Sequence, residues 1–104
     1  MTKIHIFFFM ENTVKQLIHR KDLVVFSKSY CPYCKQVKQV FKSRNLNPEI
    51  VELDIHPDGK QIQKVLLQKT NHGTVPSVWF QGRFVGGSTE AIHKAQSGTF
   101  DLSR

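Results

Sequence analysis

Residues 23–41, LVVFSKSYCPYCKQVKQVF, contain an apolar run that passes directly into an amphipathic pattern. The run LVVF, residues 23–26, has no polar interruption and consists of residues that favour a strand covered on both faces. Pro32 suits a first helical turn, where its missing N–H has no partner to lose. The apolar residues that follow recur at helical spacing: Val37, Val40 and Phe41. The stretch therefore predicts a strand that leads through a short turn into a helix, with Cys31 at the junction.

A helix is predicted before this stretch, and a second strand and helix after it. Asn12 or Thr13 can cap the first helix, whose apolar residues recur every three or four positions until the polar residues around Asp22. Residues 47–55 alternate as a strand does until proline and glycine break the pattern at 57–59. The apolar residues of the next helix are Ile62, Val65 and Leu66. A strand-helix-strand-helix order favours parallel pairing of the two strands.

The last third of the chain predicts a hairpin and a final helix. Residues 77–80 and 83–87 are typical of two short antiparallel strands joined by a tight turn at 81–82. Ser88 can cap a helix that Gly98 ends. The elements then follow the order αβαβαββα around one mixed four-stranded sheet flanked by helices. This α/β order is that of the thioredoxin-like fold.

Length and charge limit the classes of function. The 104 residues suit one domain, and 15 Lys and Arg against 8 Asp and Glu give a net charge of +7, which favours anionic partners. The positive residues are spread along the chain and no nucleic-acid-binding motif accompanies them, so we expect a solvated basic surface and no nucleic-acid partner.

The first residues, MTKIHIFFFMEN, are apolar but resemble no targeting segment. The apolar run is shorter than a signal-peptide core, lacks a cleavage site and is too short to span a bilayer. We treat residues 1–11 as an apolar extension before a domain of residues 12–104, and expect no membrane partner. Two closely spaced cysteines cannot form the disulfide framework of small secreted proteins, so we expect a reducing, cytoplasmic compartment.

Cys31 and Cys34 are the candidate catalytic residues. On the first turn of a helix, residues three apart lie on the same side, so their sulfurs can meet and form a disulfide. Cys31 should face free backbone N–H groups and the positive end of the helix dipole, with Lys28 and Lys35 as cationic neighbours. Such surroundings lower a thiol pKa from about 8.5 to roughly 3.5–7.5. Cys34, one turn further on, should keep a higher pKa and act second.

Two other interpretations of the cysteine pair, a zinc site and a structural disulfide, have less support from the sequence. A zinc site needs four ligands, and the remaining candidates, His56, His72 and His93, are scattered over different elements, so we expect no metal. A purely structural disulfide that closes so short a loop would add little stability. The strand-to-helix setting favours a redox pair.

Three segments in order resemble the dithiol glutaredoxins over residues 12–100 or so. They are KSYCPYCKQ (28–36), GTVPSVWF (73–80) and FVGGSTEAI (84–92). Thioredoxins typically carry Cys-Gly-Pro-Cys, and monothiol glutaredoxins Cys-Gly-Phe-Ser, and neither sequence occurs here.

The resemblance implies a glutathione site. The Thr74-Val75-Pro76 segment would contain a cis peptide bond before Pro76 and would place the Val75 backbone beside Cys31, where it can pair with an extended peptide. The family's other glutathione-binding positions correspond to Lys28 and Gln63 for the glycine carboxylate, Tyr33 beside the sulfur, and Gly87, Ser88, Thr89 and Glu90 for the γ-glutamyl group. Thr89-Glu90 departs from the usual Ser-Asp by one methylene in the carboxylate.

The resemblance also implies the reaction. We expect a glutathione-dependent thiol-disulfide oxidoreductase that reduces protein disulfides and glutathione mixed disulfides, with Cys31 as nucleophile and Cys34 as resolving thiol. Glutathione would be a co-substrate, and no tightly bound cofactor is expected. The partners would be glutathionylated or disulfide-containing proteins, and the chain a monomer. The alternatives are a thioredoxin-like reductase fed by a flavoprotein, and an iron-sulfur cluster carrier bridged through Cys31 and glutathione.

Overall fold

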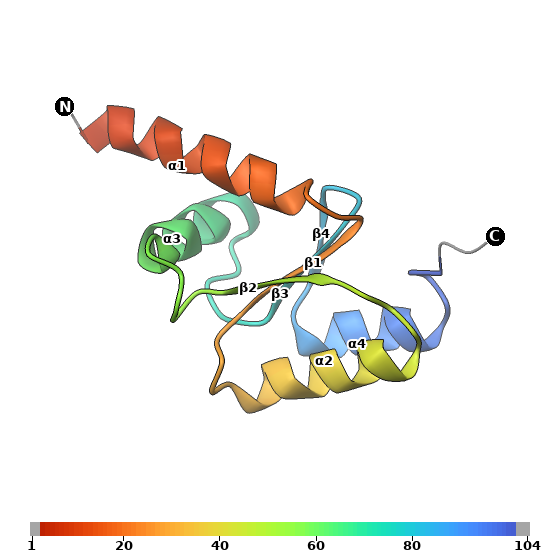
Figure 1. The fold of residues 1–104 in the computed structure, drawn as a ribbon. Helices are drawn as coiled ribbons and strands as arrows, with labels where there is room; N and C mark the ends of the chain where they lie inside the picture. The colour runs from red at the N-terminus through yellow and green to blue at the C-terminus, as the bar shows by residue number, and fades with distance from the viewer. Residues whose placement is uncertain (1–2, 102–104) are drawn as a thin grey trace.

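The computed structural model describes residues 3–101 as one four-stranded sheet between two pairs of helices (Figure 1). The elements in chain order are α1 (Lys3–Ile18), β1 (Leu23–Ser27), α2 (Pro32–Ser43), β2 (Glu49–Glu52), α3 (Gly59–Thr70), β3 (Ser77–Phe80), β4 (Arg83–Gly86) and α4 (Ser88–Gln96). This order is the predicted αβαβαββα, and it confirms the thioredoxin-like fold.

The sheet has the strand order β2-β1-β3-β4, with both kinds of pairing that the sequence predicted. β1 pairs with β2 in parallel and with β3 antiparallel, and β3 pairs with β4 antiparallel. Gln81 and Gly82 form the turn of the hairpin, with φ values of 51° and 79°. Positive φ at both central positions is what a two-residue hairpin turn requires.

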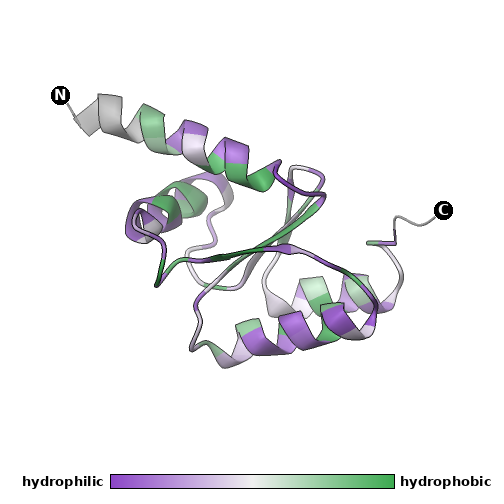
Figure 2. Cartoon of the chain, in the orientation of Figure 1, coloured by the Kyte–Doolittle hydropathy of each residue, from purple (hydrophilic) through white to green (hydrophobic). Residues whose placement is uncertain are grey.

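The buried strand β1 divides the core into two halves. Val24 and Phe26 face the core cluster that includes residues of α1 and α3, whereas Leu23 and Val25 face the cluster that includes residues of α2 and α4. All five residues of β1 are buried, as the unbroken apolar run predicted. Figure 1 shows α1 and α3 on one side of the sheet and α2 and α4 on the other, and in Figure 2 the visible face of α2 is mainly polar.

The first helix starts earlier than the sequence predicted. α1 begins at Lys3, so Asn12 and Thr13 lie inside it and neither caps it, and the Thr13 hydroxyl donates to the Phe9 carbonyl at 3.1 Å. The helix continues upstream because Met10 extends the apolar stripe and is buried in the core. Phe9, by contrast, is 63% exposed.

The division into an extension of residues 1–11 and a domain of residues 12–104 stays a prediction, and residues 1–2 and 102–104 lie outside the described part of the chain. Within residues 3–101, no helix combines the length and the apolar character that crossing a bilayer would need.

The second strand is shorter than the predicted 47–55. β2 ends at Glu52, although the Leu53 N–H still donates to the Ser27 carbonyl at 2.8 Å. The N–H groups of Ile55 and His56 bond back to the Glu52 carbonyl and turn the chain. Ile55 is consequently 70% exposed, although the alternating pattern placed it in the strand.

The turn after β2 brings the chain so close to α3 that only glycine fits at the start of that helix. A Cβ atom at Gly59 would lie 1.7 Å from the backbone oxygen of Leu53. We predict that Gly59→Ala lowers the free energy of unfolding by about 1–3 kcal/mol, the usual cost of overpacking, as measured by urea unfolding.

Gly73→Ala is the matched control for this substitution. The three atoms nearest to its Cβ would all belong to the Leu67 side chain, the first at 3.1 Å, and Leu67 is itself 46% exposed. Gly73→Ala should lower the free energy of unfolding by less than about 0.5 kcal/mol. Equal costs for the two variants would contradict the close approach at Gly59.

Candidate active site

Cys31 occupies the N-cap position of α2, as predicted. Its backbone is extended, with φ −82° and ψ 120°, and its sulfur accepts a hydrogen bond from the Cys34 N–H at 3.4 Å. Pro32 stands in the first turn. The sulfur of Cys31 therefore occupies the place where a serine or aspartate oxygen usually caps a helix.

The surroundings of Cys31 favour its thiolate. Partial burial is the largest influence and raises the pKa, but hydrogen bonds from the Cys34 thiol and from the N–H groups of Cys34 and Tyr33, together with the charge of Lys38, outweigh it. The pKa of Cys31 is therefore lowered from its ordinary value. Donors at a helix N-terminus stabilise negative charge, as the sequence analysis argued.

Cys34 has the opposite character. Its side chain is fully buried, and this burial, with the hydrogen bond that its thiol donates to Cys31, raises the pKa of Cys34. The Lys28 N–H and the Ser27 hydroxyl offset the rise only in part. Cys31 is thus a partly exposed thiol that ionises readily, and Cys34 is a buried thiol that holds its proton.

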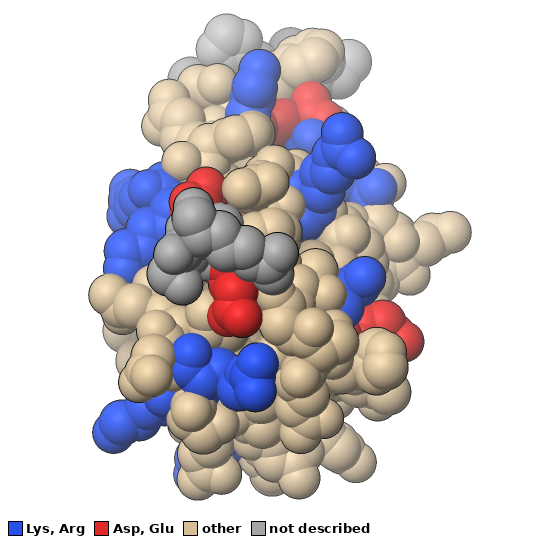
Figure 3. All heavy atoms as spheres, turned by 90° about the vertical axis from the view of Figure 1, so that its right-hand side faces the viewer, with Lys and Arg blue, Asp and Glu red and all other residues tan. Residues whose placement is uncertain are grey.

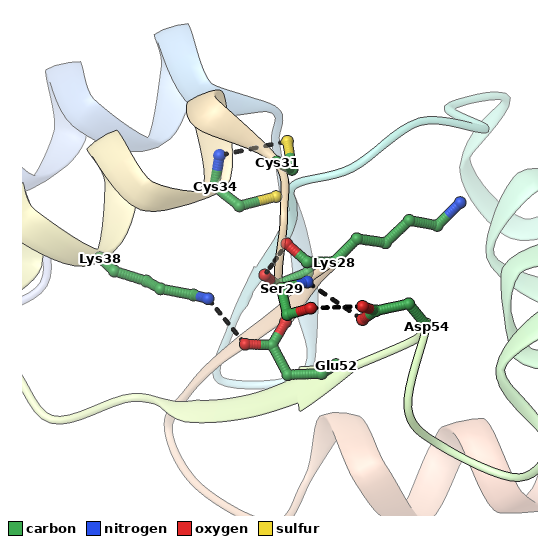
Figure 4. Close-up of polar contacts among 8 residues, drawn as sticks. Lys28, Ser29, Cys31, Cys34, Lys38, Glu52 and Asp54 are labelled. Carbon is green, nitrogen blue, oxygen red and sulfur yellow. Dashed lines mark hydrogen bonds and ion pairs between the residues drawn. The ribbon is translucent and has the colours of Figure 1, made fainter.

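The cation that acts on Cys31 differs from the predicted ones. Lys38 makes the largest charge contribution to lowering the pKa of Cys31, where the sequence pointed to Lys28 and Lys35. Lys28 instead extends away from the two cysteines (Figure 4). Helical spacing does not separate Lys35 from Lys38, because positions 31, 34 or 35, and 38 lie on the same helix face.

The Val75–Pro76 peptide bond is cis, as the resemblance implied. The Val75 carbonyl oxygen lies 3.9 Å from the Cys31 sulfur, so the backbone of this loop borders that sulfur. His72, which the sequence left as a scattered histidine, supports the loop: its Nε2 lies 3.2 Å from the Pro76 carbonyl oxygen.

A hollow of about 710 Å³ contains eight of the twelve predicted site residues. They come from the start of α2, the 74–76 loop and the start of α4: Tyr33, Thr74, Val75, Pro76, Gly87, Ser88, Thr89 and Glu90. Gly87, and not Ser88, occupies the N-cap position of α4, and no side chain caps this helix. The prediction that Ser88 caps α4 is therefore wrong, because Ser88 is already the first helical residue.

Lys28 and Gln63 line a second, smaller hollow of about 480 Å³. The Gln63 amide donates to the Gly73 carbonyl at 2.8 Å, so it also supports the loop that leads to Thr74. The structure thus brings most of the predicted residues into one hollow and places these two in a neighbouring one.

Two polar contacts around the cysteines were not predicted. Asp54 accepts hydrogen bonds from the Ser29 hydroxyl and from the Ser29 N–H, the latter at 3.0 Å, and these bonds lower the pKa of Asp54. Lys38 donates to Glu52 at 2.7 Å (Figure 4). Both contacts join β2, or the chain just after it, to the segment around the cysteine pair, and sequence spacing alone does not reveal them.

Among the side chains that the structure describes, residues 8–101, no three of the His, Cys, Asp and Glu type are grouped as a metal site would need. Basic side chains are scattered over the face seen in Figure 3 and do not gather in one patch.

A thioredoxin-like sheet that presents an ionisable Cys-x-x-Cys pair at a helix N-terminus defines a thiol-disulfide oxidoreductase. Comparison with known proteins narrows this class. The family model described as Glutaredoxin matches residues 23–85, more than half of the chain. The chain belongs to the glutaredoxin family, and its Cys-Pro-Tyr-Cys sequence is of the dithiol type.

Individual relatives agree with the family match. Glutaredoxin-1 of Rhizophagus irregularis is 38% identical over 90 residues, 86% of this chain and 89% of that protein. Glutaredoxin-C8 of Oryza sativa subsp. japonica is 44% identical over 87 residues, which are 82% of this chain but only 64% of that relative. A solved buckwheat glutaredoxin-glutathione complex has a TM-score of 0.86 and 36% identity, and covers 96% of this chain and 90% of that one.

The charge of Lys38 can be tested through the reactivity of Cys31. Because a lowered pKa keeps the thiolate present down to lower pH, reactivity is lost as pH falls through that pKa. Lys38→Met should raise the pKa of Cys31 and shift the pH profile of iodoacetamide alkylation to higher pH. Below the pKa, alkylation should slow about twofold to fivefold, the size of a partly screened charge interaction.

Lys35→Met removes the same charge from the neighbouring turn and serves as control. It should change the alkylation profile less than Lys38→Met does. A larger shift for Lys35→Met would restore the sequence-based assignment of the cation.

Proposed function

We propose that this protein is a glutathione-dependent thiol-disulfide oxidoreductase that reduces glutathione mixed disulfides and protein disulfides. The observation that carries the proposal is the setting of Cys31, a helix-capping sulfur with a lowered pKa, 3.9 Å from the Val75 carbonyl oxygen beside a hollow. The buckwheat relative solved with glutathione supports the identity of the thiol substrate.

In the first step the Cys31 thiolate attacks the glutathione sulfur of a mixed disulfide. A Cys31–glutathione disulfide forms and the substrate leaves as a thiolate that takes up a proton. A second glutathione then attacks this disulfide, so that oxidised glutathione leaves and the Cys31 thiolate is regenerated. This cycle needs one protein thiol.

Protein disulfides require both cysteines. Cys31 attacks one sulfur of the target disulfide and becomes linked to the target. Cys34 then attacks Cys31, releases the reduced target and leaves a Cys31–Cys34 disulfide that glutathione reduces. The Cys34 N–H already contacts the Cys31 sulfur at 3.4 Å, which places the second cysteine within one helical turn of the sulfur that it must attack.

The hollow offers complementary groups for glutathione. The Val75 backbone can pair with the extended cysteinyl part of the tripeptide, with Thr74 and Pro76 fixing the loop and Tyr33 beside the sulfur. The γ-glutamyl carboxylate would bind the first-turn N–H groups of α4, which have no partner within the helix. These belong to Ser88 and Thr89, next to Gly87.

Side chains would bind the two remaining charged groups of glutathione, the γ-glutamyl ammonium and the glycine carboxylate. Glu90, at the rim of the larger hollow, would bind the γ-glutamyl ammonium. Lys28 and Gln63, in the second hollow, would bind the glycine carboxylate. Glutathione would therefore extend along the Val75 backbone from one hollow toward the other.

The different roles proposed for Cys31, which attacks, and Cys34, which resolves, give a first test. Cys31→Ser should abolish turnover on a glutathionylated peptide and on a protein disulfide. Cys34→Ser should keep most turnover on the glutathionylated peptide, because external glutathione resolves the intermediate. Its turnover on the protein disulfide should fall at least tenfold. Complete loss of deglutathionylation in Cys34→Ser would refute the proposed cycle.

The ammonium contact gives a second test. Glu90→Gln removes the negative charge at nearly constant shape, so KM for a glutathionylated peptide should rise about threefold to fivefold, as expected for an exposed charge pair, with a smaller change in kcat. Glu11→Gln, on α1, is the control and should leave KM unchanged. A change of similar size in both variants would point to overall charge and not to a specific contact.

A further inference from the structure

A small polar cluster, Ser27, Lys38 and Glu52, lies between α2 and the sheet, and the proposed reaction assigns it no part. Ser27 and Glu52 are direct partners in the parallel pairing of β1 with β2. Paired residues on parallel strands point to the same face of a sheet, and here it is the face that α2 covers, because Lys38 of α2 reaches Glu52. Cys34 lies on α2, one turn before Lys38.

The Glu52 carboxylate is only half satisfied. Oε2 accepts the hydrogen bond from Lys38 at 2.7 Å, whereas Oε1 is buried and has no hydrogen-bond partner among the described residues. A buried polar atom without a partner costs free energy, about 1–3 kcal/mol and more for a charged group, so a retained one calls for an explanation.

The attack of Cys34 on Cys31 requires a proton acceptor close to Cys34. Cys34 is fully buried and protonated, and its thiol must lose a proton before it can attack Cys31. Figure 4 shows the Cys34 side chain pointing from α2 toward the strands, above the place where Lys38 meets Glu52. The Cys34 sulfur has no surface exposed to bulk water, so a neighbouring protein group is better placed to accept its proton.

Ser27 can connect the thiol to the carboxylate. Its side chain is fully buried, its hydroxyl is one of the groups that lower the pKa of Cys34, and it donates a long 3.3 Å bond to the Lys28 carbonyl. Because Glu52 Oε1 has no hydrogen-bond partner among the described residues, the transfer requires the Ser27 hydroxyl to turn from Lys28 toward Oε1. A hydroxyl can accept a proton from one neighbour while it donates its own to another. Its strand partner Glu52 supplies the acceptor.

We propose that Glu52 accepts the proton of the Cys34 thiol, passed on by the Ser27 hydroxyl, in the step that forms the Cys31–Cys34 disulfide. The proposal rests on the dithiol cycle described above. The Cys34 S–H bond breaks and the proton passes to Glu52 Oε1. The Cys34 thiolate forms the bond to Cys31, the bond from Cys31 to the target sulfur breaks, and the target leaves as a thiolate. That thiolate is reduced, Cys34 is oxidised, and the proton then passes to solvent.

Lys38 is a positioning residue in this scheme. Its hydrogen bond to Oε2 fixes the carboxylate in a site where both side chains are about three-quarters buried, with exposures of 27% and 25%. The contact engages one oxygen and leaves the other to receive the proton.

The experiment follows the two thiols separately with a symmetric aromatic disulfide whose released thiol is coloured. Cys31 attacks this reagent, releases one coloured thiol and keeps the other in a mixed disulfide. Cys34 then releases the second. The measured quantity is the rate of this second release without glutathione, divided by the rate at which added glutathione releases the same thiol. Misfolding lowers both rates, so the ratio isolates the internal step.

Glu52→Gln should lower this ratio at least tenfold, within the usual range for loss of a general base. Ser27→Ala should lower it similarly without removing the ion pair, and Glu52→Asp, which keeps a carboxylate, should recover part of it. Glu49→Gln is the matched control, since Glu49 lies on the same strand but pairs with Arg20, and its ratio should equal the native one. A ratio within twofold of native in Glu52→Gln or in Ser27→Ala overturns the proposal.

Cys34→Ser separates this failure from a failure of the proposed function. It should release no second thiol without glutathione. Release in that variant would overturn the dithiol cycle itself. Absence of release, combined with native ratios for Glu52→Gln and Ser27→Ala, would leave the cycle intact and reject Glu52 as the acceptor.

Discussion

The hydrogen bond from the Cys34 N–H to the Cys31 sulfur links the start of α2 to the ionisation of Cys31. As a helix cap, a neutral sulfur is a poor substitute for the oxygen of serine or aspartate, whereas a thiolate is a charged acceptor at the positive end of a helix. Whatever stabilises the thiolate in the folded chain therefore also stabilises the start of α2. Because the pKa of Cys31 is lowered on folding, this contribution is present above the unfolded pKa and is lost as pH falls through the folded one.

The same helix turn gives the two cysteines opposite properties. Cys31 precedes the first turn, so donors surround its sulfur, whereas Cys34 is carried into the core between α2 and the sheet. Burial disfavours charge on Cys34, and its proton is used in a hydrogen bond that favours charge on Cys31. In the proposed cycle, these opposite shifts make Cys31 the thiol that attacks first and Cys34 the thiol that reacts second. The order in which the two cysteines would react therefore depends mainly on where each lies relative to the first turn of α2, and less on the other side chains of the site.

Sequence predicted what is local and missed what depends on distant partners. The strand-turn-helix of residues 23–41 was predictable because burial, proline and helical spacing all act within a few residues. The start of α1 was not, since Met10 is helical through its contacts with the core, nor was the end of β2, where the donors of Ile55 and His56 turn back to Glu52. The eight hollow-lining residues were placed by family motifs. Lys38, Glu52 and His72 were missed, because their roles come from contacts across elements.

One face of the sheet serves both as core and as chemical site. Along β1 the residues toward α2 are apolar at Leu23 and Val25 and polar at Ser27, and along β2 Ile50 is followed on the same face by Glu52. The change occurs at the strand ends, where α2 begins and the cysteines lie. A buried hydroxyl and a carboxylate at that edge take the place of apolar packing, and the proposed proton transfer from the buried thiol would give both groups a function.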